Sequence, residues 1–273
     1  MSYDVLIIGG GPAGLSAAIN VRARGKSALV ISNPMEDSPL WHAEKIDNHL
    51  GMPGLTGPEM LESFHRHAVE SGVEFREGKA LTSMYMSGRW YVTVGTDVVD
   101  GCAVVLAAGV ARGKKYPGEA EYLGKGVSYC ATCDGMLYRE RPVVVAGYTD
   151  TSRREAEFLE SIGCQVTYLD KPRDLTVVGD EEFVTGVEVD GERLEADGVF
   201  ILRPSVAPTE LFPGVAVDNG YVVVDRLMKT NLDGLFAAGD CTGTPLQVSK
   251  AVGEGLIAGQ QAAVLAAKLA KKS

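Results

Sequence analysis

Residues 5–14 read Val5-Leu-Ile-Ile-Gly-Gly-Gly-Pro-Ala-Gly14, an apolar run that ends in a glycine-rich turn. The run predicts a buried strand, and the apolar residues 15–19 predict a helix directly after the turn. Gly9, Gly11 and Gly14 have the spacing that lets a backbone turn tightly, approach a pyrophosphate and pack a helix closely. An ordinary glycine-rich turn is the alternative. The strand, turn and helix context favours a segment that binds a dinucleotide.

The order of elements around this segment is repeated later in the chain. Residues 27–31 predict a second parallel strand, which completes a βαβ unit. The apolar run 142–146, a helical stretch at 155–162 and a strand at 166–169 repeat that order. Asp190-Gly191 stands between two further strand-like runs and predicts a hairpin. The sequence therefore predicts an α/β fold that contains two copies of the βαβ pattern.

Composition and charge exclude several classes of protein. The chain of 273 residues is 45% hydrophobic and 23% charged, as expected of an ordinary globular protein. The net charge is −10, so the chain lacks the excess of positive charge expected of a nucleic-acid-binding protein. No apolar run is long enough to span a bilayer, and the first residues do not resemble a secretory signal. We therefore expect a cytoplasmic protein that binds neither nucleic acid nor membrane.

Five cysteines are present, and two of them stand two residues apart. Cys130 and Cys133 can close into a reversible disulfide, which transfers two electrons by thiolate attack. A CxxC pair can also be half of a zinc site, but no second pair of cysteines or histidines has similar spacing. We interpret the pair as a redox switch and expect no metal site; metal binding or a structural role is the alternative. Cys102, Cys164 and Cys241 are interpreted as packing residues.

Two strand ends carry further polar candidates. The second strand ends in Ile31-Ser-Asn-Pro34 in place of the carboxylate that would grip a ribose diol. Ser32 or Asn33 could contact an adenosine instead. Gly239-Asp240 follows a late apolar strand and could place an acceptor against a polyhydroxyl chain. A turn aspartate that caps the next segment is the alternative for Asp240.

Several separated stretches together resemble the low-molecular-weight thioredoxin reductase family of FAD-containing disulfide reductases. The matching stretches are Ile7-Ile-Gly-Gly-Gly-Pro-Ala-Gly14, Gly54-Leu-Thr-Gly-Pro-Glu59, Gly126-Val-Ser-Tyr-Cys-Ala-Thr-Cys-Asp-Gly135, Gly234-Leu-Phe-Ala-Ala-Gly-Asp240, Gln247 and Gly253-Glu-Gly255. The resemblance implies two Rossmann-like three-layer domains. The FAD domain would be discontinuous, at 1–111 and 227–273, with a shortened NADPH-domain-like unit inserted at 112–226. A twofold homodimer is also implied.

The resemblance assigns roles to individual residues. Together with Ser32 and Asn33, which the strand end itself suggests, the expected FAD-binding residues are Gly9, Gly11, Pro12, Ala13, Gly14, Asn48, Ala108, Gly109, Gly239, Asp240, Gln247 and Val248. The resemblance also implies that Cys133 faces the flavin and that Cys130 attacks the disulfide of the partner. Asp134 would be the general acid or base that donates or accepts the thiol proton.

The second glycine loop departs from the pattern of a nucleotide site. The strand runs into Ala146-Gly-Tyr-Thr-Asp-Thr151, so two of the three small positions are lost. Tyr148 puts a bulky side chain where backbone should approach a pyrophosphate, and Asp150 adds a negative charge. Lys171 and Arg173 are scattered rather than clustered as a 2′-phosphate site requires. We therefore predict a second domain that persists as a scaffold without a pyridine-nucleotide site.

The chain resembles the pyridine-nucleotide-independent branch of the family, which takes electrons from ferredoxin. We therefore predict reduction of thioredoxin or a thioredoxin-like protein through FAD and Cys130/Cys133, with ferredoxin as donor. The candidate docking charges for an acidic ferredoxin are Arg112, Lys114, Lys115, Arg139, Arg141, Arg153 and Arg154, with scattered solvated charges as the alternative. Three other functions remain open: an FAD-dependent dithiol oxidase, an NADPH-dependent thioredoxin reductase with an atypical site, and a non-enzymatic flavin redox sensor.

Overall fold

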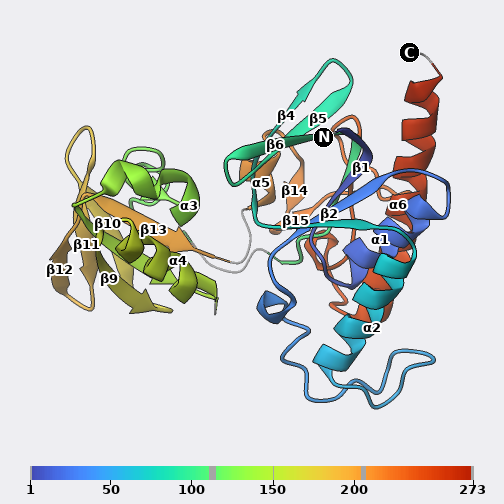
Figure 1. Cartoon of the computed structure of the whole chain (residues 1–273), viewed down its shortest axis with the longest axis horizontal. Coiled ribbons are helices and arrows are strands. Elements are labelled where there is room, and N and C mark those ends of the chain that lie inside the picture. Colours follow the sequence, from blue (N-terminus) through green and yellow to red (C-terminus); the bar gives the residue numbers. More distant parts are fainter. Residues whose placement is uncertain (1, 111–114, 150, 204–206, 272–273) are drawn as a thin grey trace. The chain divides into compact units, whose positions relative to one another are not determined.

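The computed structural model describes residues 2–110, 115–149, 151–203 and 207–271. They form two compact units, each with its own hydrophobic core (Figure 1). The first unit comprises Met1–Ala111 and Ser205–Ser273, and the second comprises Arg112–Pro204.

The chain returns to the first unit before residue 227, which is the boundary predicted from the sequence. Leu211, Phe212, Val215 and Val222 all belong to the hydrophobic core of the first unit. Phe212 packs edge-to-face on Trp90, with ring centroids 5.2 Å apart. Because these apolar side chains are buried there, residues 207–226 belong to the first unit, and the predicted boundary is wrong.

The first unit is built on a seven-stranded mixed sheet in the order β3-β2-β1-β6-β5-β4, with β16 also paired to β6. The parallel strands are β1 (Ser2–Ile8), β2 (Ala28–Ser32), β3 (Glu74–Glu77), β6 (Asp97–Leu106) and β16 (Leu235–Ala237). The antiparallel strands are β4 (Ala80–Met86) and β5 (Arg89–Val94). The predicted opening βαβ unit is therefore confirmed.

Both faces of β1 are buried. Val5 and Ile7 pack with residues of helices α1 (Pro12–Arg22) and α6 (Val248–Ala270). Leu6 and Ile8 lie in the other core, with Trp90 of β5. A continuous apolar run is the sequence that a strand covered on both faces needs.

Helices α1 and α6 approach each other through small residues, and Figure 1 shows them side by side. A Cβ on Gly255 would lie 2.1 Å from the Ala13 carbonyl oxygen, and one on Gly259 would lie 2.3 Å from that of Ala17. No larger residue fits at either glycine unless the helices separate. The last helix of the chain is thereby packed directly against the first.

Helix α2 (Gly57–Glu70) begins where the sequence predicted. Thr56 accepts a hydrogen bond from the Glu59 N–H, and the Glu59 carboxylate accepts one from the Thr56 N–H, which makes a capping box. The other short elements of this unit are η1 (Met35–Asp37), α5 (Pro208–Leu211), β14 (Val217–Asp218), β15 (Tyr221–Val222) and η3 (Asp240–Thr242).

The second unit has three layers. Its central parallel sheet contains β7 (Val127–Ser128), β13 (Gly198–Leu202), β8 (Pro142–Gly147) and β9 (Gln165–Asp170), in that order. One face packs with α3 (Ala131–Asp134), η2 (Gly135–Tyr138) and α4 (Thr151–Ser161). The other face packs with the antiparallel strands β10 (Leu175–Gly179), β11 (Val184–Val189) and β12 (Glu192–Glu195).

Two local predictions for this unit are confirmed. The order β8, α4, β9 repeats the opening of the chain. Asp190 and Gly191 both have positive φ, 51° and 83°, and connect β11 to β12 as a tight hairpin turn. The degenerate loop therefore sits in the structural context of a nucleotide-binding domain.

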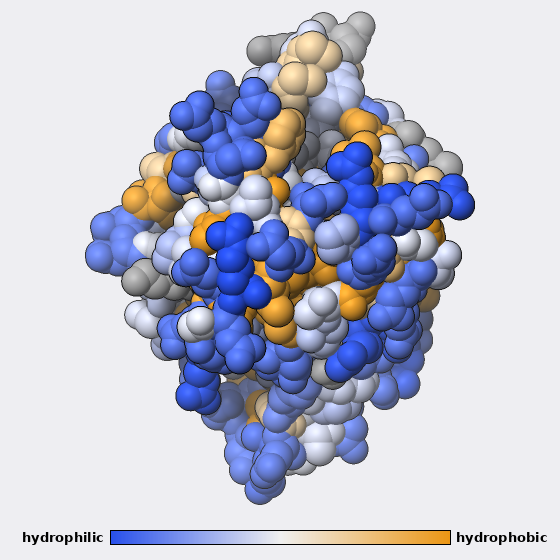
Figure 2. Space-filling model, turned by 90° about the vertical axis from the view of Figure 1, so that its left-hand side faces the viewer, coloured by the Kyte–Doolittle hydropathy of each residue, from blue (hydrophilic) through white to orange (hydrophobic). Residues whose placement is uncertain are grey.

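Much of the surface drawn in Figure 2 is hydrophilic, and apolar side chains are visible between the charged ones. In the second unit, the exposed large apolar side chains include Met136, Leu137 and Phe183. Among the described residues, every helix is too short or too polar to cross a bilayer.

Candidate functional site

The predicted dinucleotide loop lies between the carboxyl ends of β1 and β6. Gly9 has a φ of 113°, and a Cβ there would lie 2.2 Å from the Ala107 carbonyl oxygen. A Cβ on Gly14 would lie 1.8 Å from the carbonyl oxygen of Gly9. Both positions exclude side chains, so the tight turn and close helix packing predicted for these two glycines are present.

Gly11 is the open position of the same loop. A Cβ there would meet no protein atom within 4 Å. Gly11 is the N-cap of α1, no side chain caps the helix, and Pro12 occupies its first turn. The N–H groups at the start of a helix carry partial positive charge and bind phosphate oxygens. The residues present therefore fit a pyrophosphate.

The ends of β2 and β6 flank this loop. A Cβ on Gly10 would lie 2.8 Å from the Ser32 hydroxyl oxygen, and Asn33 follows Ser32 directly. A Cβ on Gly9 would lie 3.1 Å from the Cα of Ala108. Ser32 and Ala108 are therefore brought close to the predicted dinucleotide loop. Gly109, next to Ala108, has a φ of 67° and lies in an open position.

Asp240 reaches the same edge of the sheet from a distant part of the chain. It begins η3, directly after Gly239, which has a φ of 86°. A Cβ on Gly239 would lie 2.7 Å from the Cβ of Ala13, in the first turn of α1. The loop after β16 therefore contacts the start of α1.

The remaining cofactor candidates meet at the start of α6. Gln247 is the N-cap of this helix, and Val248 is its first residue. The Asn48 side-chain amide donates a hydrogen bond of 2.7 Å to the side-chain oxygen of Gln247. A second bond of 3.2 Å joins His49 to Ser249. The segment that carries Asn48 is thus tied to the helix that carries Gln247 and Val248.

The cysteine pair lies in the second unit, at the short helix α3. Cys130 and Cys133 form a disulfide, with Cα atoms 5.4 Å apart. Cys130 is the N-cap of α3, and its sulfur accepts a hydrogen bond of 3.2 Å from the Cys133 N–H. Both residues are partly exposed. An N–H that points at a sulfur favours its thiolate form once the disulfide is reduced.

Asp134 is held by a residue that the sequence reasoning did not select. The Ser128 hydroxyl donates a 2.6 Å hydrogen bond to the Asp134 carboxylate and accepts one of 3.1 Å from the Cys130 N–H. Ser128 is 4% exposed. Its place two residues before Cys130 was the available signal, because serine hydroxyls commonly bond to nearby backbone groups.

Glu155 is a second residue that was missed. Its carboxylate accepts a hydrogen bond of 3.3 Å from the Ala131 N–H in the first turn of α3. Glu155 lies on α4, so no local pattern near the cysteines indicated it. Together with Ser128 it fixes the backbone of the cysteine helix.

The second glycine loop carries a bulky side chain, Tyr148. The Tyr148 and Tyr116 hydroxyls hydrogen-bond to each other, and the Tyr148 hydroxyl donates to the Pro172 carbonyl at 3.2 Å. The Arg203 guanidinium lies 5.4 Å from the Tyr116 ring centroid and 5.7 Å from that of Tyr148. These three side chains line a cavity of about 1000 Å³ within this unit. Asp150 lies outside the described residues.

A buried ion pair stands behind these tyrosines. Arg203 makes two bonds to the Glu119 carboxylate, at 2.5 and 2.8 Å, and the Glu119 side chain is fully buried. Burial alone would raise the pKa of Glu119. Hydrogen bonds from Arg203, from the Tyr116 N–H and from the Tyr129 hydroxyl, together with the Arg203 charge, lower that pKa below its ordinary value.

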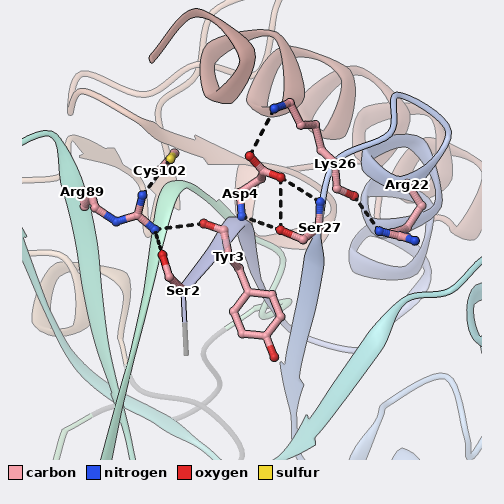
Figure 3. A network of polar contacts seen from close by, with 8 residues as sticks. All are labelled: Ser2, Tyr3, Asp4, Arg22, Lys26, Ser27, Arg89 and Cys102. Atoms are coloured by element: carbon pink, nitrogen blue, oxygen red, sulfur yellow. Dashed lines mark hydrogen bonds and ion pairs between the residues drawn. The ribbon is translucent and has the colours of Figure 1, made fainter. Parts of the chain in front are cut away.

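The three other cysteines differ in their surroundings. Cys164 and Cys241 are buried, as predicted, and burial raises the pKa of the Cys241 thiol to about 12. Cys102 is only partly buried, and the Arg89 guanidinium donates to its sulfur at 3.0 Å. Figure 3 shows that Arg89 also bonds to Ser2 and to the Tyr3 carbonyl. Cys102 is therefore part of a polar network and not a simple packing residue.

Comparison with known proteins gives consistent results over almost the whole chain. A family model described as pyridine nucleotide-disulphide oxidoreductase matches residues 3–183 and 172–255. A thioredoxin reductase of Listeria monocytogenes is 32% identical, with 95% of this chain and 92% of that protein covered. One of Aquifex aeolicus is 33% identical, with 87% and 85% covered.

Solved structures agree with these relatives. A crystal structure of a ferredoxin-flavin thioredoxin reductase from Clostridium acetobutylicum has a TM-score of 0.95 and 34% identity, with 99% of each chain covered. A thioredoxin reductase structure from Gloeobacter violaceus has a TM-score of 0.85 and 32% identity, with 100% of this chain and 95% of that chain covered.

The family implies a flavin cofactor, and two features of the first unit fit one. The open position at Gly11 leaves room for a pyrophosphate, and the Asp240 loop lies against the same helix. The resemblance inferred from the sequence is thus confirmed. The chain belongs to the pyridine nucleotide-disulphide oxidoreductase family and is a thioredoxin reductase-like flavin disulfide oxidoreductase.

Proposed function

We propose that this protein uses FAD and the Cys130/Cys133 dithiol to reduce thioredoxin or a thioredoxin-like protein, with ferredoxin as electron donor. The donor assignment depends mainly on one observation: Tyr148 stands in the second glycine loop, where a pyridine nucleotide would need open backbone, and its hydroxyl bonds to that of Tyr116. The likeness to a ferredoxin-flavin thioredoxin reductase supports the same donor.

The first unit provides the residues that would hold FAD. The pyrophosphate would be bound by the loop from Gly9 to Gly14, including Pro12 and Ala13, and the adenosine by Ser32 and Asn33. Ala108, Gly109, Gly239 and Asp240 would contact the ribityl side, and Asn48, Gln247 and Val248 the ring. When bound, the flavin supplies the electron pair that opens the Cys130–Cys133 disulfide.

The dithiol then performs the exchange. The Cys130 thiolate attacks one sulfur of the partner's disulfide, and the other partner sulfur leaves and takes a proton. The Cys133 thiolate next attacks the Cys130 sulfur, which releases the second partner thiol and forms the Cys130–Cys133 bond again. Asp134 accepts and returns the proton in these steps, while Ser128 orients its carboxylate.

Three separate anaerobic reductions would test the donor, with NADPH, NADH or reduced ferredoxin added to the flavin-loaded protein. We expect rapid loss of the flavin absorbance with ferredoxin alone. Oxidised thioredoxin is then added and its thiols are titrated. Rapid bleaching by either pyridine nucleotide would overturn the donor assignment. Bleaching by ferredoxin without new thiols would instead overturn the proposed substrate.

Exposed arginines near the cysteine helix are candidates for ferredoxin docking. Arg139 directly follows η2, Arg141 precedes β8, and Arg154 lies on α4, which packs against α3. Arg153 is also exposed, but its guanidinium stacks on the Tyr168 ring at 4.0 Å. The predicted Arg112 and Lys114 lie outside the described residues.

Reversing the charge of two of these arginines should slow reduction by ferredoxin. In Arg139→Glu/Arg154→Glu we expect the second-order rate constant to fall about tenfold at low salt, because steering of an acidic partner depends on local positive charge. The difference from the natural protein should shrink as ionic strength rises. Stopped-flow flavin absorbance gives both quantities.

A matched control carries the same charge change elsewhere in the second unit. Lys125 and Arg193 are exposed; Lys125 bonds through its carbonyl to β11 and Arg193 lies on β12, so both belong to the layer opposite α4. Lys125→Glu/Arg193→Glu should leave the rate constant within about twofold. Equal slowing by both double variants would show that net charge, and not a surface around α4, controls the reaction.

A further inference from the structure

Helix α6 carries a charged pair whose role the sequence did not suggest. Lys250 and Glu254 lie one turn apart, with the ammonium nitrogen 3.2 Å from a carboxylate oxygen. Their side chains are only 16% and 19% exposed. Glu254 is the central residue of the Gly253-Glu-Gly255 stretch. A long charged side chain is rarely buried to this extent unless it has specific partners.

The partners of both side chains lie in the loop after β16. The Lys250 ammonium donates to the carbonyl oxygens of Gly239 and Gly243, at 2.8 and 2.7 Å, and to the Thr242 hydroxyl at 3.0 Å. The Glu254 carboxylate accepts from the Gly239 N–H and from the Thr242 hydroxyl, both at 2.8 Å. The pair therefore binds both backbone polar groups of Gly239 and both ends of the Gly239–Gly243 segment.

This segment adopts a backbone conformation that needs external support. Gly239 has φ 86° and ψ −150°, a combination open almost only to glycine. Gly239 is the residue before Asp240 and lies against Ala13 of α1, while Gly255 of α6 approaches the Ala13 carbonyl. The Lys250–Glu254 pair thus stands where α6, the Asp240 loop and the start of α1 meet.

We propose that Lys250 and Glu254 are positioning residues for the flavin nucleotide. They hold the Gly239–Gly243 segment in shape, so that Asp240 lies beside the amino end of α1 before the cofactor arrives. The inference rests on the FAD-binding role proposed for Asp240. Fixing a binding loop in advance strengthens ligand binding because the ligand need not order the loop itself.

An ordinary helical ion pair would have different consequences. Exposed lysine–glutamate pairs four residues apart stabilise a helix by about 0.3–0.5 kcal/mol. Removing such a pair is not expected to change ligand affinity. Lys250 and Glu254 instead direct five hydrogen bonds, described above, to a neighbouring loop. Hydrogen bonds that involve a charged group are the stronger class. The affinity for FAD is therefore the property that separates the two roles.

The test uses full-length apoprotein and measures FAD binding by quenching of flavin fluorescence. Lys250→Met and Glu254→Gln should each weaken binding at least about tenfold, equivalent to about 1.4 kcal/mol. Lys268→Met is the matched control, because Lys268 is exposed in the last turn of the same helix. It should bind FAD as the natural protein does. FAD affinity within twofold of the natural protein in both variants would overturn the inference.

Hydrogen–deuterium exchange of the apoproteins provides a second readout that needs no cofactor. We expect faster exchange in the peptide that contains Gly239 and Thr242, with β1 and β2 unchanged. Faster exchange throughout the first unit would assign the pair to general stability and overturn the positioning role. If the natural apoprotein itself does not bind FAD, the proposed function fails. Normal binding by the natural protein and by both variants would reject only the role of the pair.

Discussion

Cys133→Ser is expected to abolish the proposed reduction of thioredoxin, with turnover lower by roughly four orders of magnitude, because the mixed disulfide can no longer be resolved. The remaining Cys130 thiol still attacks the partner, and its thiolate keeps the hydrogen bond from the residue 133 N–H. The variant should therefore accumulate a covalent complex with oxidised thioredoxin. Non-reducing electrophoresis and intact mass measure the complex, and a thiol assay measures turnover.

The reciprocal variant defines the division of labour between the two thiols. Cys130→Ser should also lose turnover but should form little covalent complex, because the attacking sulfur is gone. Cys102→Ser is the matched control, since Cys102 is the other partly exposed thiol and lies in the first unit. Cys102→Ser should keep normal turnover and a normal reaction with oxidised thioredoxin. A complex that forms with Cys130→Ser and not with Cys133→Ser would reverse the proposed roles.

Arg203→Met is expected to destabilise the second unit by about 3–5 kcal/mol, because it leaves the Glu119 carboxylate buried without its cation. The double variant Arg203→Met/Glu119→Gln should recover much of that loss, since it removes the uncompensated charge. Urea unfolding, followed by circular dichroism, gives the free energy of unfolding of each variant. Arg193→Met, which breaks the exposed Arg193–Glu195 pair, should cost less than about 1 kcal/mol.

The Glu119–Arg203 ion pair also predicts the direction in which the stability of the protein changes with pH. The pKa of Glu119 is lower in the folded protein than its ordinary value of 4.5. The ionised Glu119 carboxylate therefore makes its full contribution to the free energy of unfolding above that value. The contribution is lost as the pH falls through the lowered pKa of the folded protein. The stability difference between the natural protein and Glu119→Gln should shrink on acidification below the ordinary value. A difference that is constant over this pH range would contradict the assignment.

The parts of the fold that the sequence predicted are those specified by local pattern. The glycine loop after β1, the βαβ repeat at β8 and the hairpin at Asp190-Gly191 each depend on residues close together in the chain. The segment 207–226 was assigned to the wrong unit because its elements are short. Only the burial of Leu211 and Phe212 reveals where it packs.

In the candidate site too, features encoded by local pattern were predicted and contacts between distant residues were not. Gly9, Gly14 and the cysteine pair were identified because spacing along the chain encodes their geometry. The Glu119–Arg203 pair joins residues separated by 84 positions, and no local pattern encodes such a contact. Glu155 was missed for the same reason, since it reaches the cysteine helix from another helix.

The division of the first unit into two chain segments has a consequence for biosynthesis. The second unit, Arg112–Pro204, is continuous and contains every strand of its own sheet, so it can fold while translation proceeds. The first unit lacks β16 and α6 until the residues after the second unit have been synthesised. The sheet and helix layer of the first unit are therefore completed only after the whole second unit has been synthesised, and a product that ends before α6 would lack the helix that packs against α1.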